Sequence, residues 1–109
     1  MTGKDYQQAI KRTLPAGMTR EQRLAMLALG LGGETGEVVD HIKKHLFQGH
    51  ELDAGKVADE CGDVLWYMGH LLNEIGTDFE SVQRRNVNKL IKRYPRGYSA
   101  ADSINREEE

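Results

Sequence analysis

The sequence contains little cysteine, little proline and few aromatic residues, and it has no long apolar run. Its single cysteine, Cys61, excludes an internal disulfide, and with it the disulfide framework on which many small secreted domains depend. No apolar run approaches the roughly 18 residues that a transmembrane helix needs, and the first residues do not resemble a signal peptide. We therefore expect a soluble protein of the reducing cytoplasm, with Cys61 as a small side chain of the core.

No charge of one sign dominates. Fifteen Lys and Arg against 17 Asp and Glu leave a net charge of −2, so the chain has no global attraction to nucleic acid or to a membrane surface. Residues 84–96 form a local basic run with six Lys or Arg and no acid. No aromatic platform is interleaved with these charges, so the pattern does not favour nucleic-acid binding.

What the sequence does contain is helical periodicity. Apolar residues recur at helical spacing in four segments, and no period of two persists. Start signals precede three of these segments: Thr19 with Gln22 and Thr77 with Glu80 match capping boxes, and Asp53 can cap a helix on its own. The prediction is an all-α protein, a four-helix bundle-like protomer with helices over about residues 4–13, 20–47, 54–75 and 78–94.

These four helices are expected to form one domain over residues 1–98. The segment 99–109, which ends in three glutamates, has too little apolar content for a core of its own and is expected to be an acidic surface tail. Glycines cluster in residues 30–36 of the second helix, and each costs roughly 1 kcal/mol relative to alanine in a helix interior. The cluster therefore allows a bend or break near residues 30–33.

Four acids interrupt the apolar helices at three-residue spacing. Glu34 and Glu37 lie in the second helix, and Glu60 and Asp63 lie in the third. Both stretches follow one template of acid, spacer, glycine, acid and two branched apolar residues. At about 100° per residue, each pair flanks the buried stripe of its helix, so the two helices share one layout.

A turn near Gly49 would make these two helices antiparallel, and the acid pairs lie at nearly equal chain distances from it. Four facing carboxylates repel one another unless a cation lies between them. Oxygen-only ligands favour Mg²⁺, with Mn²⁺ as a substitute. Two alternatives stay open: acids that only solvate the helix edges, and a zinc site that uses His41 and His45 with Glu37 or His50.

The fourth predicted helix carries a basic edge. Asn86, Lys89 and Arg93 share one face, which suits phosphate, although a solvated face that balances the acids would show the same pattern. Lys43 and Lys44 follow the first acid pair by one or two turns and would add positive charge at the mouth of an acid site.

The ordered set of motifs resembles the MazG-like nucleoside triphosphate pyrophosphohydrolases, an all-α family marked by E-x-x-E, a spacer of variable length and E-x-x-D. Here the pattern reads Glu34-x-x-Glu37, 22 intervening residues and Glu60-x-x-Asp63. The similarity covers roughly residues 5–98 and extends to further stretches typical of the shorter members, namely Tyr6-Gln7, Thr13, residues 29–37, Lys43-Lys44, residues 62–67 and residues 88–95.

The resemblance implies hydrolysis of a nucleoside triphosphate to the monophosphate and pyrophosphate. It assigns Mg²⁺ binding to Glu34, Glu37, Glu60 and Asp63, and a base contact to Tyr67. The further substrate contacts that we expect are Lys44, Asn86, Lys89, Arg93 and Tyr94. Lys89 and Arg93 would stabilise charge on the phosphates. Some relatives have a further glutamate where this chain has Gly33, so either Glu37 acts as the base or the metal activates water without a dedicated base.

Family members are typically homodimers or homotetramers, and we expect oligomerisation to complete the bundle. The expected role is clearance of non-standard or surplus nucleotides. Two other functions stay open: phosphoribosyl-ATP pyrophosphohydrolase, which shares the architecture, and a non-catalytic helical module that binds a nucleotide or a partner protein.

Overall fold

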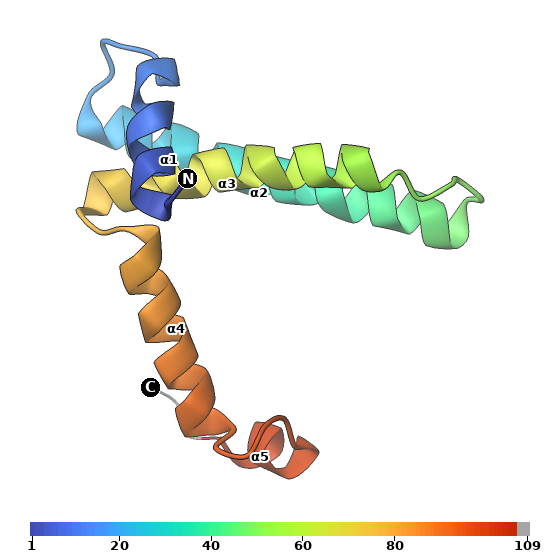
Figure 1. Ribbon diagram of the computed structural model, residues 1–109. Helices are drawn as coiled ribbons and strands as arrows, with labels where there is room; N and C mark the ends of the chain where they lie inside the picture. The colour runs from blue at the N-terminus through green and yellow to red at the C-terminus, as the bar shows by residue number, and fades with distance from the viewer. Residues whose placement is uncertain (107–109) are drawn as a thin grey trace.

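The computed structural model describes residues 1–106, and the predicted all-α fold is confirmed there (Figure 1). The described part of the chain has no β-strand, and none of its helices is both long enough and apolar enough to cross a membrane. The elements are α1 (Gly3–Ile10), the short 3₁₀ helix η1 (Lys11–Thr13), α2 (Arg20–Phe47), α3 (Ala54–Ile75), α4 (Phe79–Arg93) and α5 (Ala100–Asn105).

Helices α2 and α3 form a long antiparallel hairpin. The predicted capping box of Thr19 with Gln22 is confirmed, as is the cap of α3, where Asp53 Oδ1 accepts from the Lys56 amide at 3.0 Å. Helix α2 is continuous over 28 residues, so the glycine cluster does not break it. Gly76, with φ of 78°, ends α3 in the left-handed conformation that glycine adopts without steric cost.

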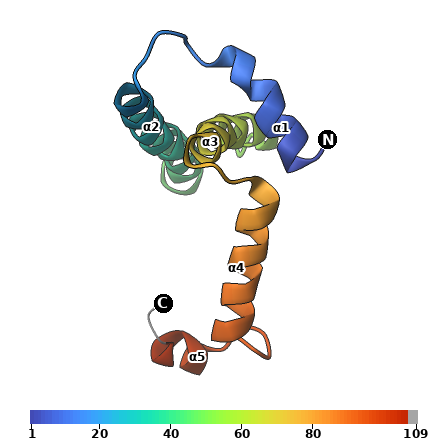
Figure 2. The ribbon, with the colours of Figure 1, turned by 90° about the vertical axis from the view of Figure 1, so that its left-hand side faces the viewer.

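Helix α1 lies across α3 at the end of the hairpin opposite its turn (Figures 1 and 2). The buried apolar residues are Ile10, Leu27 and Leu72, one from each of the first three helices. Gly69 permits this crossing, because a Cβ there would lie 2.8 Å from Ile10 Cδ1. The core of the described chain is therefore small and confined to one end of the hairpin.

Helix α4 leaves this core at a steep angle and packs mainly against α1 (Figure 2). Its apolar residues Val87, Leu90 and Ile91 are exposed. The radius of gyration of 17.2 Å exceeds the value of about 13 Å for a compact chain of this length. The four predicted helices are thus present, but α4 does not close a bundle within one chain.

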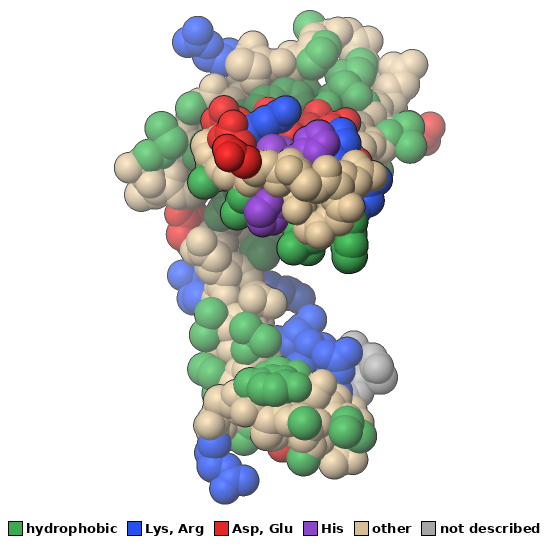
Figure 3. All heavy atoms as spheres, turned by 90° about the vertical axis from the view of Figure 1, so that its right-hand side faces the viewer, with side chains coloured by type: hydrophobic (Ala, Val, Ile, Leu, Met, Phe, Trp, Pro, Cys, Tyr) green, Lys and Arg blue, Asp and Glu red, His purple; other side chains and the backbone are tan. Residues whose placement is uncertain are grey.

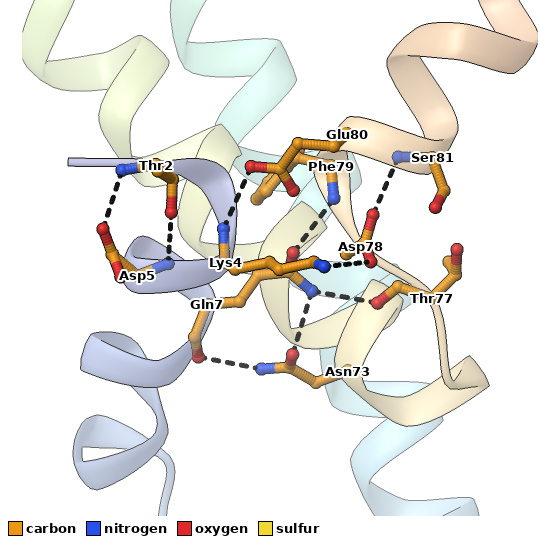
Figure 4. A network of polar contacts seen from close by, with 10 residues as sticks. All are labelled: Thr2, Lys4, Asp5, Gln7, Asn73, Thr77, Asp78, Phe79, Glu80 and Ser81. Atoms are coloured by element: carbon orange, nitrogen blue, oxygen red, sulfur yellow. Dashed lines mark hydrogen bonds and ion pairs between the residues drawn. The ribbon is translucent and has the colours of Figure 1, made fainter.

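The turn between α3 and α4 is held by the side-chain amide of Gln7, which is 5% exposed (Figure 4). Gln7 Nε2 donates to Asn73 Oδ1 at 3.0 Å and to the Thr77 carbonyl at 3.1 Å, and Gln7 Oε1 accepts from the Phe79 amide at 3.0 Å. Asn73 Nδ2 in turn donates to the Gln7 carbonyl at 3.1 Å. These bonds fix the direction in which α4 starts.

Two local predictions are wrong. Thr77 and Glu80 do not form a capping box: Asp78 caps α4 by accepting from the Ser81 amide at 2.7 Å, and Glu80 instead accepts from the Lys4 amide of α1 at 3.3 Å. Cys61 is exposed and not part of the core.

The predicted acidic tail contains the short helix α5, which was not predicted. Ser99 caps it by accepting from the Asp102 amide at 3.0 Å. The three terminal glutamates, 107–109, lie outside the described residues.

Candidate functional site

The α2–α3 hairpin brings the four motif acids to neighbouring positions. Glu34 and Asp63 line one cavity of about 340 Å³ together with Trp66 and Tyr67. Glu37 and Glu60 line a second cavity of about 210 Å³, closer to the turn of the hairpin. Each cavity thus takes one acid from each motif, as an antiparallel pairing of the two repeats requires.

None of these four carboxylates has a hydrogen-bonding or ion-pair partner within residues 1–106. Glu60 Oε2 is buried without any partner, an arrangement that costs free energy unless a ligand satisfies it. Lys44, which lines the second cavity, is paired with Asp40: that hydrogen bond raises the pKa of the Lys44 ammonium, and the charges of Glu37 and Glu60 add to the effect.

This donor set fits a hard divalent cation. All four groups offer carboxylate oxygens, which are the ligands of Mg²⁺ and Mn²⁺. As the side chains stand, no three His, Cys, Asp or Glu groups in the described residues converge on one point. Glu37 and Asp63 are exposed, so their side chains are free to change rotamer.

The positions of the histidines do not support the alternative of a zinc site. His45 Nδ1 is paired with the His50 carbonyl at 2.8 Å, and His41 Nε2 is buried without a partner. The second cavity is lined by His41 and His50 together with charges of both signs, which gather at the turn end of the hairpin (Figure 3).

The first cavity has an aromatic wall formed by Trp66 and Tyr67. Tyr67 was predicted to contact the base, whereas no role was predicted for Trp66. The two rings meet edge to face at 4.9 Å, and Trp66 also contacts the ring of His70 at 4.3 Å. Trp66 Nε1 donates to Thr13 Oγ1 at 2.7 Å, which holds the indole in place. Because Trp66 directly precedes Tyr67 in the sequence, it could have been predicted to lie near the same cavity.

The predicted phosphate-binding residues lie elsewhere. Asn86, Lys89, Arg93 and Tyr94 belong to α4 and its C-terminal end, and α4 extends away from the hairpin (Figure 1). Asn86 and Lys89 line an open surface on α4, and Tyr94 packs against Tyr98 with ring centroids 5.5 Å apart. Within one chain, therefore, these residues do not meet the acids; Lys44 does, at the second cavity.

Comparison with known families decides what this arrangement belongs to. The model of the MazG nucleotide pyrophosphohydrolase domain matches residues 22–98 of the chain. The chain belongs to this MazG family. The match includes both acid motifs, the aromatic wall and α4, whereas α1 and α5 lie outside it.

The chain is also similar to a phage protein whose name states no function. The Gene 37 protein of Mycobacterium phage L5 is 34% identical over 87 residues, which cover 76% of this chain and 76% of that protein. No solved structure matches the chain.

Proposed function

We propose that this MazG protein is a Mg²⁺-dependent nucleotide pyrophosphohydrolase that converts a nucleoside or deoxynucleoside triphosphate to the monophosphate and pyrophosphate. The observation that carries the proposal is the hairpin itself, where four carboxylates without hydrogen-bond or ion-pair partners line two cavities, one of them walled by Trp66 and Tyr67. Unpaired carboxylates suit a metal that binds phosphates, and aromatic rings suit a nucleobase. The role that we propose for this activity is the clearance of non-standard or surplus nucleotides.

Glu34, Glu37, Glu60 and Asp63 would hold the metal. When bound, Mg²⁺ would neutralise phosphate charge and make water more acidic. The carboxylates of the chain supply the negative charge that keeps the ion between α2 and α3. Removal of the ion would restore their mutual repulsion.

The reaction adds water across the α–β phosphoanhydride bond. The water oxygen forms a bond to phosphorus, the bridging bond breaks, and pyrophosphate leaves. Glu37 is our choice to accept the water proton, because its carboxylate is exposed and lines the cavity that also holds Lys44. Trp66 and Tyr67 would orient the base at the other cavity.

Positive charge for the phosphates would come from a second copy of the chain. Helix α4, which carries Lys89 and Arg93, extends away from its own hairpin (Figure 1), whereas the exposed apolar residues Val87, Leu90 and Ile91 on the same helix suit packing against another protomer. We therefore propose a homodimer or homotetramer in which α4 of one protomer covers the hairpin of its neighbour.

The direct test is pyrophosphate release from a panel of NTPs and dNTPs with Mg²⁺ or Mn²⁺. Wild type is compared with Glu37→Gln and Asp63→Asn, and with Asp59→Asn as a matched exposed acid on α3. We expect activity in wild type and Asp59→Asn only. Equal activity in all four proteins would refute the site.

Two other functions make different predictions for the same panel. A non-catalytic module would bind nucleotide in calorimetry at saturating Mg²⁺ without turnover. A phosphoribosyl-ATP pyrophosphohydrolase would complement a strain that lacks that step of histidine synthesis and would be inactive on the panel.

A further inference from the structure

Gly30 of α2 lies directly against the ring of Tyr67 of α3. A Cβ atom at position 30 would stand 2.0 Å from Tyr67 Cε1, 2.3 Å from Cζ and 2.7 Å from Cδ1. Non-bonded carbon atoms pack at about 3.5–4.0 Å. The ring therefore occupies space that only glycine leaves open, and any other residue at position 30 would displace it.

The neighbouring glycines provide an internal comparison. A Cβ at Gly32, Gly33 or Gly36 would meet nothing within 4 Å. All four positions lie in the same helix and carry a similar propensity cost. Gly30 alone among them is explained by a tertiary contact in the described chain.

The contact matters because Tyr67 also lines the 340 Å³ cavity with Glu34, Asp63 and Trp66. Trp66 is held on the other side by Thr13 and His70. Since the indole is fixed, the room left in the cavity depends on how closely the Tyr67 ring approaches the backbone of α2.

We propose that Gly30 is a positioning residue for Tyr67 and that it determines the size of the planar group that the cavity admits. With glycine at position 30 the ring lies close to α2 and the cavity accepts a bicyclic purine. With alanine the ring moves into the cavity and space remains only for a smaller pyrimidine. This statement about base size rests on the proposed function, because it assumes that a nucleobase enters the cavity.

The first arm of the test needs no activity. Trp66 is the single tryptophan of the chain and touches the Tyr67 ring, so its emission reports displacement of that ring. We expect Gly30→Ala to change the Trp66 emission and to lower Tm, and Gly32→Ala to leave the emission unchanged and to raise Tm. In a Tyr67→Ala background, Gly30→Ala should also raise Tm, because the obstructing ring is gone. Equal behaviour of Gly30→Ala and Gly32→Ala in the wild-type background would overturn the proposal.

The second arm measures KM and kcat for one purine and one pyrimidine triphosphate. Gly30→Ala should raise KM for the purine by about tenfold and KM for the pyrimidine much less, at similar kcat, as expected when a pocket loses room of about one methyl group. An equal rise of KM for both substrates would overturn the inference that Gly30 determines the size of the base. A wild type that is inactive on every nucleotide would instead refute the proposed function, and the contact would then be judged by the Trp66 emission and Tm.

Discussion

The two ends of the α2–α3 hairpin differ in how their polar side chains are paired. At the end crossed by α1, several polar groups pair with one another: the Gln7 amide uses both its oxygen and its nitrogen, and Arg23 Nη2 lies 2.7 Å from Glu74, a hydrogen bond that lowers the pKa of that carboxyl. His70 Nε2 and Glu80 Oε2 are buried there without a partner. Toward the turn, the four motif carboxylates have no hydrogen-bond or ion-pair partner among the described residues. Polar pairing therefore holds the fold at one end, and the proposed site lies toward the other.

The largest effect that tests this contrast is expected from Glu60→Gln. The variant should lose about 100-fold or more of the pyrophosphohydrolase activity, whereas its Tm in metal-free buffer should stay equal or rise, because one of four like charges is removed. The rise of Tm on addition of Mg²⁺ should shrink. Asp59→Asn is the control, and a metal-free Tm that falls in Glu60→Gln alone would mean that the acid serves the fold.

The opposite result is expected from Gln7→Leu. The substitution keeps the volume but leaves the Phe79 amide, the Thr77 carbonyl and Asn73 Oδ1 without a partner, so the free energy of unfolding should fall by about 2–4 kcal/mol. Urea denaturation measures this loss. Gln8→Leu, at an exposed neighbouring position, should cost less than about 0.5 kcal/mol. Equal losses would show that the network around Gln7 does not hold the turn.

A smaller effect tests whether the open end is completed by another protomer. Lys89→Ala combined with Arg93→Ala should reduce activity by about tenfold or more. Refolding this variant together with Glu37→Gln should restore activity above that of either protein alone, because mixed oligomers contain one hairpin and one α4 that are both intact. A mixture of Glu37→Gln with Glu60→Gln is the control and should restore nothing, since both changes affect the hairpin. Failure of the first mixture would place the cations in their own protomer.

The smallest effect concerns His70 at the closed end. Its ring is 2% exposed with Nε2 unpartnered, and burial lowers its pKa below the ordinary value. The folded chain therefore binds this proton less readily than the unfolded chain, so the contribution to stability is present above about pH 6.5 and is lost as pH falls below it. Between pH 7 and pH 5, the Tm of wild type should fall by a few degrees more than that of His70→Phe. Parallel pH profiles would contradict this.

Much of the fold was readable locally. Thr19 with Gln22, Asp53 and Gly76 each act within one turn of their own helix, so their roles follow from a few neighbouring residues. The cap of α4 was mispredicted because Glu80 is engaged by the Lys4 amide, which is 76 residues away in the chain. Helix propensity and capping patterns carry no information about a contact between residues so far apart in the sequence.

Part of the candidate site could likewise be predicted from local sequence patterns. The repeated acid spacing predicted that the four carboxylates lie at neighbouring positions of the hairpin, because helix geometry converts spacing into position. It did not indicate Trp66 or Gly30, whose proposed roles depend on which residue of one helix meets which residue of another. Nor did it indicate that α4 would point away from the hairpin, since that direction is determined by the buried amide of Gln7.

The exposure of Cys61 has a practical consequence. The chain carries one thiol, and it stands beside Glu60 on the surface of α3. A single maleimide spin label or fluorophore can therefore be attached to wild type without removing other cysteines. Two labels in an oligomer would give the distance between neighbouring hairpins, and one label would report metal and nucleotide arriving at the adjacent acids.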